Sequence, residues 1–257
     1  MRRNALLLSF SMLFLLSGNS RGEVTQHFDA AGNLVPEAKK RAPSAAHNTQ
    51  KYSVVQKLGL RPDVRYEFYP VFGKTYAEIV KSAEENGPFN KDARTRQTSA
   101  FSWSMGWTYQ FSYTTEYDED NDKLHCDISI HDVTLSYDIT ITLPVLTDNS
   151  FLNDIEKDLW ENYISRLLES EHGRVKIVKD DPQEGLLRRM GEISYLMLDA
   201  DEENRADTLI ERYVREETAQ IGKETARQIR QKLDQHSKRS EEGTSSNSPN
   251  RDSKKKR

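Results

Sequence analysis

The clearest pattern in the sequence is an alternation of large apolar and small or polar residues that begins at Phe101. Apolar side chains take every second position as far as Tyr113, with Ser, Thr, Gly and Gln between them. Successive side chains of a strand point to opposite faces, so this period of two predicts a long strand with one buried face. The apolar positions are Phe101, Trp103, Met105, Trp107, Tyr109, Phe111 and Tyr113.

A return strand is predicted from Leu124 to Val145, after a turn at residues 118–123. Its apolar residues lie at even positions up to Ile130 and at odd positions from Val133 onward. A slip of one residue turns every later side chain to the other face, so we expect a break or β-bulge at residues 131–132. A shorter alternation at residues 64–70 predicts a further strand on the N-terminal side of the hairpin.

Helical spacing replaces the alternation in three later segments and in one short segment after Thr75. From Ser150 to about Lys179 the apolar residues form two adjacent stripes, and we expect this helix to pack on the sheet. The stripes are Leu152, Ile155, Leu159, Tyr163 and Leu167, and beside them Trp160, Ile164, Leu168 and His172. A second helix is predicted at residues 186–198, and a third from residues 199–201 past 229.

These elements predict an α+β fold. Its antiparallel β-sheet consists of the long hairpin plus the N-terminal strand, and three to four helices pack on it.

The N-terminus has the order of a secretory signal peptide. Arg2 and Arg3 precede an apolar run at residues 5–16, and small residues follow. The run is shorter than the roughly 20 residues that span a bilayer, and Asn19 stands where a lipid-bearing cysteine would be needed. We therefore expect a signal peptide at 1–22, an irregular leader at 23–60, a single domain at 61–235 and a disordered basic tail at 236–257. A periplasmic or secreted protein without a transmembrane segment after cleavage is predicted.

Charge and cysteine content narrow the possible partners. Residues 1–22 carry a net charge of +3 and residues 237–257 carry +4, so the overall −4 leaves −11 for residues 23–236. Such an acidic body repels nucleic acid. Cys126 is the only cysteine, so no intramolecular disulfide can form and the core alone must stabilise the fold. We expect Cys126 to be a buried strand residue.

One stretch, residues 168–172, comes close to a catalytic motif. In H-E-x-x-H, two histidines one helical turn apart bind zinc while the Glu deprotonates the metal-bound water. Glu169 and His172 are present, but Leu168 replaces the first His, and catalytic zinc sites normally have three protein ligands. The spacing alone therefore favours a Glu and a His on a helix surface. Half of a di-iron site is also conceivable, although no second E-x-x-H occurs in the chain.

Two further patterns have ordinary structural interpretations. Asp118, Asp120 and Asp122 imitate the start of an EF-hand loop, but Lys123 stands at the position of its glycine, which favours a solvated hairpin turn. The aromatic alternation that begins at Phe101 could form a stacking platform for carbohydrate or nucleic acid, but a buried core is the favoured interpretation.

Several landmarks arrive in a familiar order: residues 68–75 (FYPVFGKT), Asn-Gly-Pro at 86–88, the Trp-rich strand, residues 139–144 (ITITLP) and the E-x-x-H helix. From Tyr66 to Gly222 the chain resembles a bacterial domain-of-unknown-function family of exported, predicted Zn-dependent proteases. The resemblance implies a zinc cofactor, with Glu169 at the position of the general base and His172 at that of the second metal ligand.

The chain departs from this family at other ligand positions. Leu168 replaces the first His, Val214 replaces an Asp in a later segment, and Gln220 or Ile221 stands in place of a further His.

Three functions remain open at this point. The first is a non-catalytic or impaired protease-like protein that acts as an envelope binding or scaffolding module, with a protein or peptide partner. The second is an active zinc metallopeptidase that takes its missing ligands from His131 and from Glu211 or Glu217. The third is a structural envelope protein whose long third helix pairs with a partner.

Overall fold

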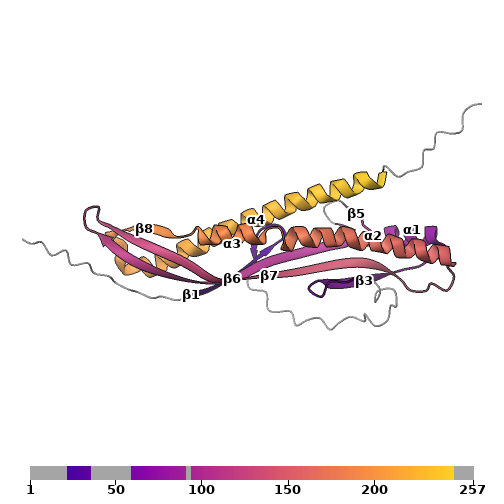
Figure 1. Ribbon diagram of the computed structural model, residues 1–257, viewed down its shortest axis with the longest axis horizontal. Helices are drawn as coiled ribbons and strands as arrows, with labels where there is room; N and C mark the ends of the chain where they lie inside the picture. Colours follow the sequence, from indigo (N-terminus) through magenta and orange to yellow (C-terminus); the bar gives the residue numbers. More distant parts are fainter. Residues whose placement is uncertain (1–21, 36–58, 91–93, 246–257) are drawn as a thin grey trace, which may run out of the picture. The chain divides into compact units, whose positions relative to one another are not determined.

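The computed structural model describes residues 22–35, 59–90 and 94–245 (Figure 1). It divides into two compact units. Among the described residues, unit 1 contains 22–24, 108–134 and 187–220, and unit 2 contains 25–107, 135–186 and 221–245. Strand β6 (Ala100–Asp118), strand β7 (Lys123–Leu146) and helix α4 (Ala206–Ser245) each contribute to both units. Residues 61–235, expected to form a single domain, are thus shared between the two units.

The α+β fold class is confirmed, and the predicted hairpin of β6 and β7 is its main component. The strand order is β2-β1-β6-β7-β3, where β1 is Gly22–Asp29, β2 is Leu34–Val35 and β3 is Arg65–Val71. The alternating apolar residues of β6 from Trp103 to Tyr113 are buried, which confirms that they form core. A separate two-stranded sheet pairs β4 (Phe89–Asn90) with β5 (Thr95–Arg96).

Strands β1 and β2 lie in the segment that we expected to be an irregular leader. In β1 the residues Val24, Gln26 and Phe28 are buried at alternate positions. Gln26 accepts a hydrogen bond from the indole nitrogen of Trp107 at 3.1 Å, so a polar residue occupies a core position. This polar residue interrupts the apolar alternation, which explains why the sequence pattern did not reveal the strand. Residues 36–58 lie outside the described part of the chain.

Strand β3 is present where the sequence predicted it, but it runs parallel to β7 rather than antiparallel. The paired residues run from Arg65 with Thr140 to Val71 with Leu146. Alternation reports which side chains are buried and contains no information on strand direction. Helix α1 (Tyr76–Asn86) lies between β3 and the hairpin in the chain and is part of the crossover that a parallel neighbour requires.

In unit 2, helix α2 (Asp154–Lys179) lies along the sheet (Figure 1). It begins at a capping box in which Asn153 and Glu156 satisfy each other's backbone amides. Most of the buried residues of α2 follow the second predicted stripe: Trp160, Ile164 and Leu168 are buried, and Glu171, Val175 and Val178 continue the same face. Of the first stripe only Leu152, which precedes the helix, is buried. Ile155 and Leu159 of the first stripe are 73% and 43% exposed.

In unit 1, the hairpin end of β6 and β7 is joined by strand β8 (Tyr195–Asp199), which pairs antiparallel with residues 123–127 of β7. The prediction of a helix over residues 186–198 was wrong for this strand, because helix α3 ends at Gly191 (Gln183–Gly191). A short apolar run does not distinguish strand from helix by its periodicity. The 3-10 helix η3 (Ala200–Arg205) then leads into α4.

The phase change in β7 is present as predicted. Leu124, Cys126 and Ile128 are buried at even positions, and the apolar residues Ile139, Ile141, Leu143 and Val145 are buried at odd positions. Asp132 has φ 53°, in the left-handed region that is typical of a bulge. Cys126 is fully buried as expected, and burial raises the pKa of its thiol to about 11.

Helix α4 continues to Ser245, although we expected disorder from residue 236. Composition indicated a segment that cannot bury surface, but a long helix already nucleated upstream can extend through polar residues that contain no proline. Residues 246–257 and residues 1–21 of the predicted signal peptide lie outside the described residues, while Gly22, its last predicted residue, begins β1. Among the described helices, none is long and apolar enough to cross a membrane.

A single glycine allows α4 to contact the sheet of unit 2 closely. A Cβ atom placed on Gly222 would lie 2.3 Å from Cζ of Phe28 and 2.6 Å from Cη2 of Trp107. These two rings pack against each other with centroids 4.7 Å apart, so neither can move away freely. The close approach therefore depends on the absence of a side chain at this position.

We predict that Gly222→Ala lowers the free energy of unfolding, because overpacking a tight contact costs about 1–3 kcal/mol, more than the roughly 1 kcal/mol that alanine gains over glycine in a helix. Urea denaturation followed by far-UV circular dichroism measures the change. Gly185→Ala in α3 is the matched control, since nothing lies within 4 Å of its added Cβ, and it should stabilise the chain. An equal stabilisation by both variants would contradict the predicted contact.

Candidate functional site

The E-x-x-H segment of α2 distributes its residues over different faces of the helix. Leu168 is buried, one turn after Ile164. Glu169 is exposed. Thus the residue at the first ligand position of the motif belongs to the core of unit 2, and the predicted general base faces solvent.

His172 is half-buried and makes a specific contact with strand β3. Its Nε2 atom lies 2.8 Å from the hydroxyl oxygen of Tyr66. The backbone amide of Arg61 donates to the same oxygen at 3.1 Å, so the hydroxyl proton is available to donate to the imidazole. Burial of the ring lowers the pKa of His172, and the positive charge of Arg61 lowers it further. Both effects favour a neutral imidazole whose Nε2 accepts a hydrogen bond from the hydroxyl of Tyr66.

Asp63, the carboxylate whose charge acts on His172, is itself bound by two basic side chains. Asp63 accepts two hydrogen bonds from the guanidinium of Arg61, at 3.2 and 3.1 Å, and another from Lys179. The bonds from Arg61 and then from Lys179 hold the pKa of Asp63 well below its usual range. The carboxylate therefore stays ionised and paired. Through Lys179, the C-terminal end of α2 is joined to the segment before β3.

These residues do not fit a zincin-type metal centre. Leu168 has no lone pair, and the Nε2 atom of His172 is already hydrogen-bonded. Within residues 22–35, 59–90 and 94–245, no group of three or more His, Cys, Asp or Glu side chains could hold a metal ion. Of the alternative donors, His131, Glu211 and Glu217 all belong to unit 1, whereas His172 belongs to unit 2.

Two residues of the later segment that the resemblance compares with metal ligands lie in the core. Val214, at the position of the implied Asp, is buried, and of the two candidates for the implied His, Ile221 is buried while Gln220 is exposed. Thr218 is buried as well, and its hydroxyl lies 3.0 Å from that of Tyr109. In these positions α4 provides packing rather than metal donors.

Sequence reasoning missed a buried charged group in unit 2, one residue before His172. Glu171 is only 1% exposed; its carboxylate accepts a hydrogen bond from the hydroxyl of Ser99 at 2.6 Å and is paired with Arg174 at 3.3 Å. Arg174 also donates to the hydroxyl of Ser237 at 3.2 Å. This network connects α2 with the segment before β6 and with the C-terminal part of α4.

Helical spacing could have located Glu171. It continues the series Ile164, Leu168, Val175 at intervals of three and four, so it must lie on the buried face. A buried carboxylate is stable only when paired and hydrogen-bonded, as it is here. His236 packs beside this network, because a Cβ on Gly173 would lie 2.6 Å from its Nε2 atom.

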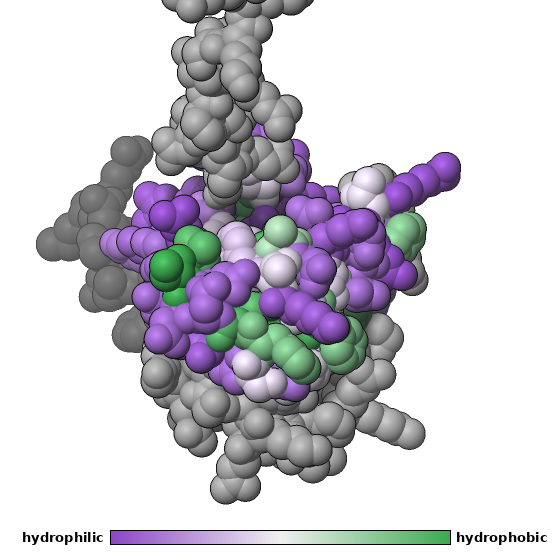
Figure 2. Space-filling model, turned by 90° about the vertical axis from the view of Figure 1, so that its right-hand side faces the viewer, coloured by the Kyte–Doolittle hydropathy of each residue, from purple (hydrophilic) through white to green (hydrophobic). Residues whose placement is uncertain are grey.

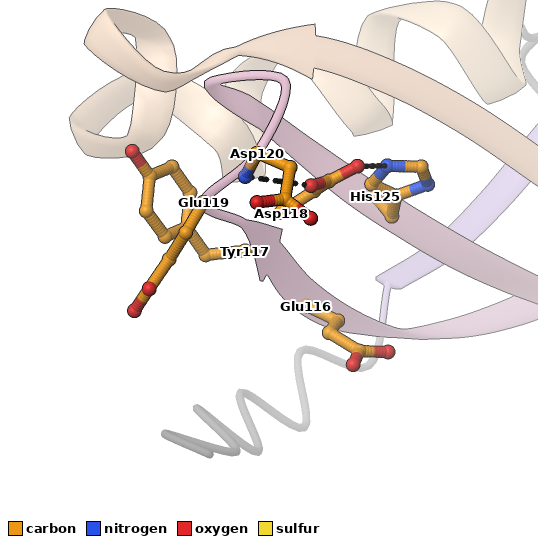
Figure 3. Close-up of a pocket in the computed structure, with 6 residues that line it drawn as sticks. All are labelled: Glu116, Tyr117, Asp118, Glu119, Asp120 and His125. Atoms are coloured by element: carbon orange, nitrogen blue, oxygen red, sulfur yellow. Dashed lines mark hydrogen bonds and ion pairs between the residues drawn. The ribbon is translucent and has the colours of Figure 1, made fainter. Parts of the chain in front are cut away.

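Unit 1 contains a separate cavity of about 450 Å³ at the hairpin end (Figure 3). The residues that line it are Glu116, Tyr117, Asp118, Glu119, Asp120 and His125. His125 connects this cavity to β8, since its Nδ1 lies 2.5 Å from the hydroxyl of Tyr195 and its Nε2 lies 3.3 Å from the carboxylate of Asp118.

Two carboxylates at this end, Asp118 in the cavity lining and Asp122 beside it, form hydrogen bonds within the turn. Asp118 accepts hydrogen bonds from the backbone amides of Asp120 and Asn121 and from the side chain of Asn121, which lowers its pKa. Asp122 accepts one from Tyr117 at 2.7 Å. The hairpin turn is present where the sequence predicted it, and these carboxylates are hydrogen-bonded within it.

Comparison with known proteins identifies the family and nothing more specific. Neither a search of curated proteins nor one of solved structures finds a match. The family model named "Bacterial protein of unknown function (DUF922)" matches residues 66–219. The predicted resemblance to a bacterial domain of unknown function is confirmed, while the protease association stays a prediction. Because the match covers more than half of the chain, this protein belongs to the DUF922 family of bacterial proteins of unknown function.

Proposed function

We propose that this chain is an exported, non-catalytic member of its family that acts as a binding or scaffolding module in the bacterial envelope. The observation that carries the proposal is the hydrogen bond between His172 and Tyr66. The one imidazole of the E-x-x-H segment serves the packing of α2 against β3. Export is inferred from Arg2 and Arg3 and the apolar run at residues 5–16.

A zinc peptidase would need a different arrangement at the same place. His172 would have to leave Tyr66, and at least two further donors would have to come within about 2 Å of a metal ion. Leu168 cannot supply one and is held in the core beside Ile164. The ionic contacts of Asp63 and the network around Glu171 also keep α2 in its present orientation. These contacts support a rigid helix that presents a surface rather than a reaction centre.

Metal analysis tests the proposal directly. We predict that the purified full chain, incubated with excess zinc and then desalted, retains no stoichiometric zinc, and that it shows no chelator-sensitive cleavage of a denatured protein substrate. Zinc can be measured by inductively coupled plasma mass spectrometry.

One zinc per chain, lost in His172→Ala, would refute a non-catalytic role. Chelator-sensitive cleavage that disappears in Glu169→Gln would do so as well, and would favour the metallopeptidase.

The neutral state of His172 predicts a pH dependence of stability. Its pKa in the folded chain is below the ordinary value of 6.5, so the unfolded chain binds the proton more readily. The associated stability is fully present above that value and is lost as the pH falls toward the folded-state pKa.

In His172→Gln this loss should be absent, and the free energy of unfolding should vary less between about pH 7 and pH 5 than in the original chain. Urea denaturation across this range measures the difference, in which contributions from other groups cancel. Identical pH profiles would show that the ring is not held neutral by its surroundings.

A further inference from the structure

Helix α2 exposes apolar side chains that the core of unit 2 does not cover. Phe151, Ile155 and Leu159 are 61%, 73% and 43% exposed, and we call them the apolar strip. They are spaced four residues apart, so Ile155 and Leu159 lie one helical turn apart, and Phe151 precedes the N-cap Asn153. Figure 2 looks onto the end of unit 2 that bears the start of α2 and shows hydrophobic side chains surrounded by hydrophilic ones.

The strip is not needed to bury α2. The core contacts of the same turns are made by Leu152, Trp160 and Ile164, which cluster with Val71 of β3 and Ile79 of α1. Single exposed apolar residues are ordinary, but two on adjacent turns of one helix, with a third just before its N-cap, are typical of an interaction surface.

Acidic residues border the strip. Asp154, Asp158 and Glu161 are exposed, and residues 151–161 carry a net charge of −3. Asp154 lies in the first turn, where a negative charge stabilises the helix N-terminus, but Asp158 and Glu161 lie beyond it and gain little from the helix dipole. Lys157 is the only basic residue in this segment, and it pairs with Asp154 at 3.4 Å. The charge of the border is therefore left for a partner to neutralise.

The strip is also held rigidly. The capping box fixes the first turn of α2, and the carboxylate of Glu156 accepts a hydrogen bond from the backbone amide of Tyr76 at 3.3 Å. In the following turn, Trp160 belongs to the core cluster and stacks with Tyr163 at a centroid distance of 5.5 Å. A preformed surface loses little conformational entropy when a partner binds.

We propose that the apolar strip binds an amphipathic helical segment of an envelope protein that carries apolar side chains at helical spacing, flanked by Lys or Arg. The partner rests on the proposed function as a binding module. Apolar burial supplies the affinity, and the basic flanks, opposite Asp158 and Glu161, give specificity and faster association. A second copy of the chain is a poorer occupant, because it would bring the same acidic borders together, and an anionic lipid surface would be repelled in the same way.

The test uses the purified full chain and two fluorescein-labelled peptides of roughly 18 residues, or five helical turns. Both have Leu at i, i+3, i+4 and i+7; one has Lys at the flanking positions and the other Glu. Fluorescence anisotropy should show binding of the Lys peptide that weakens as salt is added, and little binding of the Glu peptide.

Variants of the strip and its border locate the binding. Ile155→Glu combined with Leu159→Glu should weaken binding of the Lys peptide by about tenfold or more. Asp158→Lys should weaken binding of the Lys peptide and strengthen that of the Glu peptide. Met197→Glu is the matched control, since Met197 is a 52% exposed apolar residue of β8 in unit 1, and it should leave binding unchanged. Far-UV circular dichroism checks that each variant is folded.

Four outcomes would overturn the proposal: equal binding of the two peptides, no binding of either, binding that survives Ile155→Glu with Leu159→Glu, or loss of binding in Met197→Glu. Sedimentation of the chain alone tests whether a second copy occupies the strip. A dimer that is lost in Ile155→Glu would assign the strip to self-association. Binding to phosphatidylglycerol vesicles that depends on Ile155 would assign it to lipid. Each of these results is independent of the zinc measurement. Failure of the proposed binding at the apolar strip can therefore be distinguished from failure of the non-catalytic assignment.

Discussion

The periodicity of α2 is the constraint on which the functional conclusions depend. A helix with 3.6 residues per turn can direct only one face to the sheet, and in α2 that face takes in Trp160, Ile164, Leu168 and Glu171. With Leu168 inside, Glu169 must point to solvent and His172 reaches the boundary, where Tyr66 meets it. The same rotation leaves Ile155 outside. Burial of Leu168 thus has two consequences. It prevents a zinc pair with His172, and it leaves the apolar side chain of Ile155 on the surface at the start of α2.

Much of the sheet was predictable because its patterns are long. The alternation in β6 admits only one register, and the phase change in β7 required a residue such as Asp132 with unusual backbone geometry. Strand β8 and the direction of β3 were not predictable in the same way. Tyr195–Asp199 is too short for its period to be decisive, and the parallel pairing with β7 depends on how the chain returns through α1. Tertiary packing decides such cases.

The candidate site shows a similar division. The absence of a zincin pair at residue 168 was visible in the sequence, but the use of His172 was not, because its partner Tyr66 lies in a strand more than a hundred residues earlier. In α2 both stripes were apolar, so composition could not say which of them the sheet would cover. Glu171 lies outside the catalytic motif and was not predicted, although the spacing of its buried neighbours indicated a paired carboxylate.

The single thiol of the chain offers a natural probe of how unit 1 opens. Cys126 is inaccessible to solvent in the folded state, and β8 pairs with it through Leu196. A buried thiol with a raised pKa reacts with alkylating reagents only when its surroundings separate. Its alkylation rate therefore reports how often the packing around Cys126 opens, without a label or a substitution, and follows the local motions of one unit while the other stays silent.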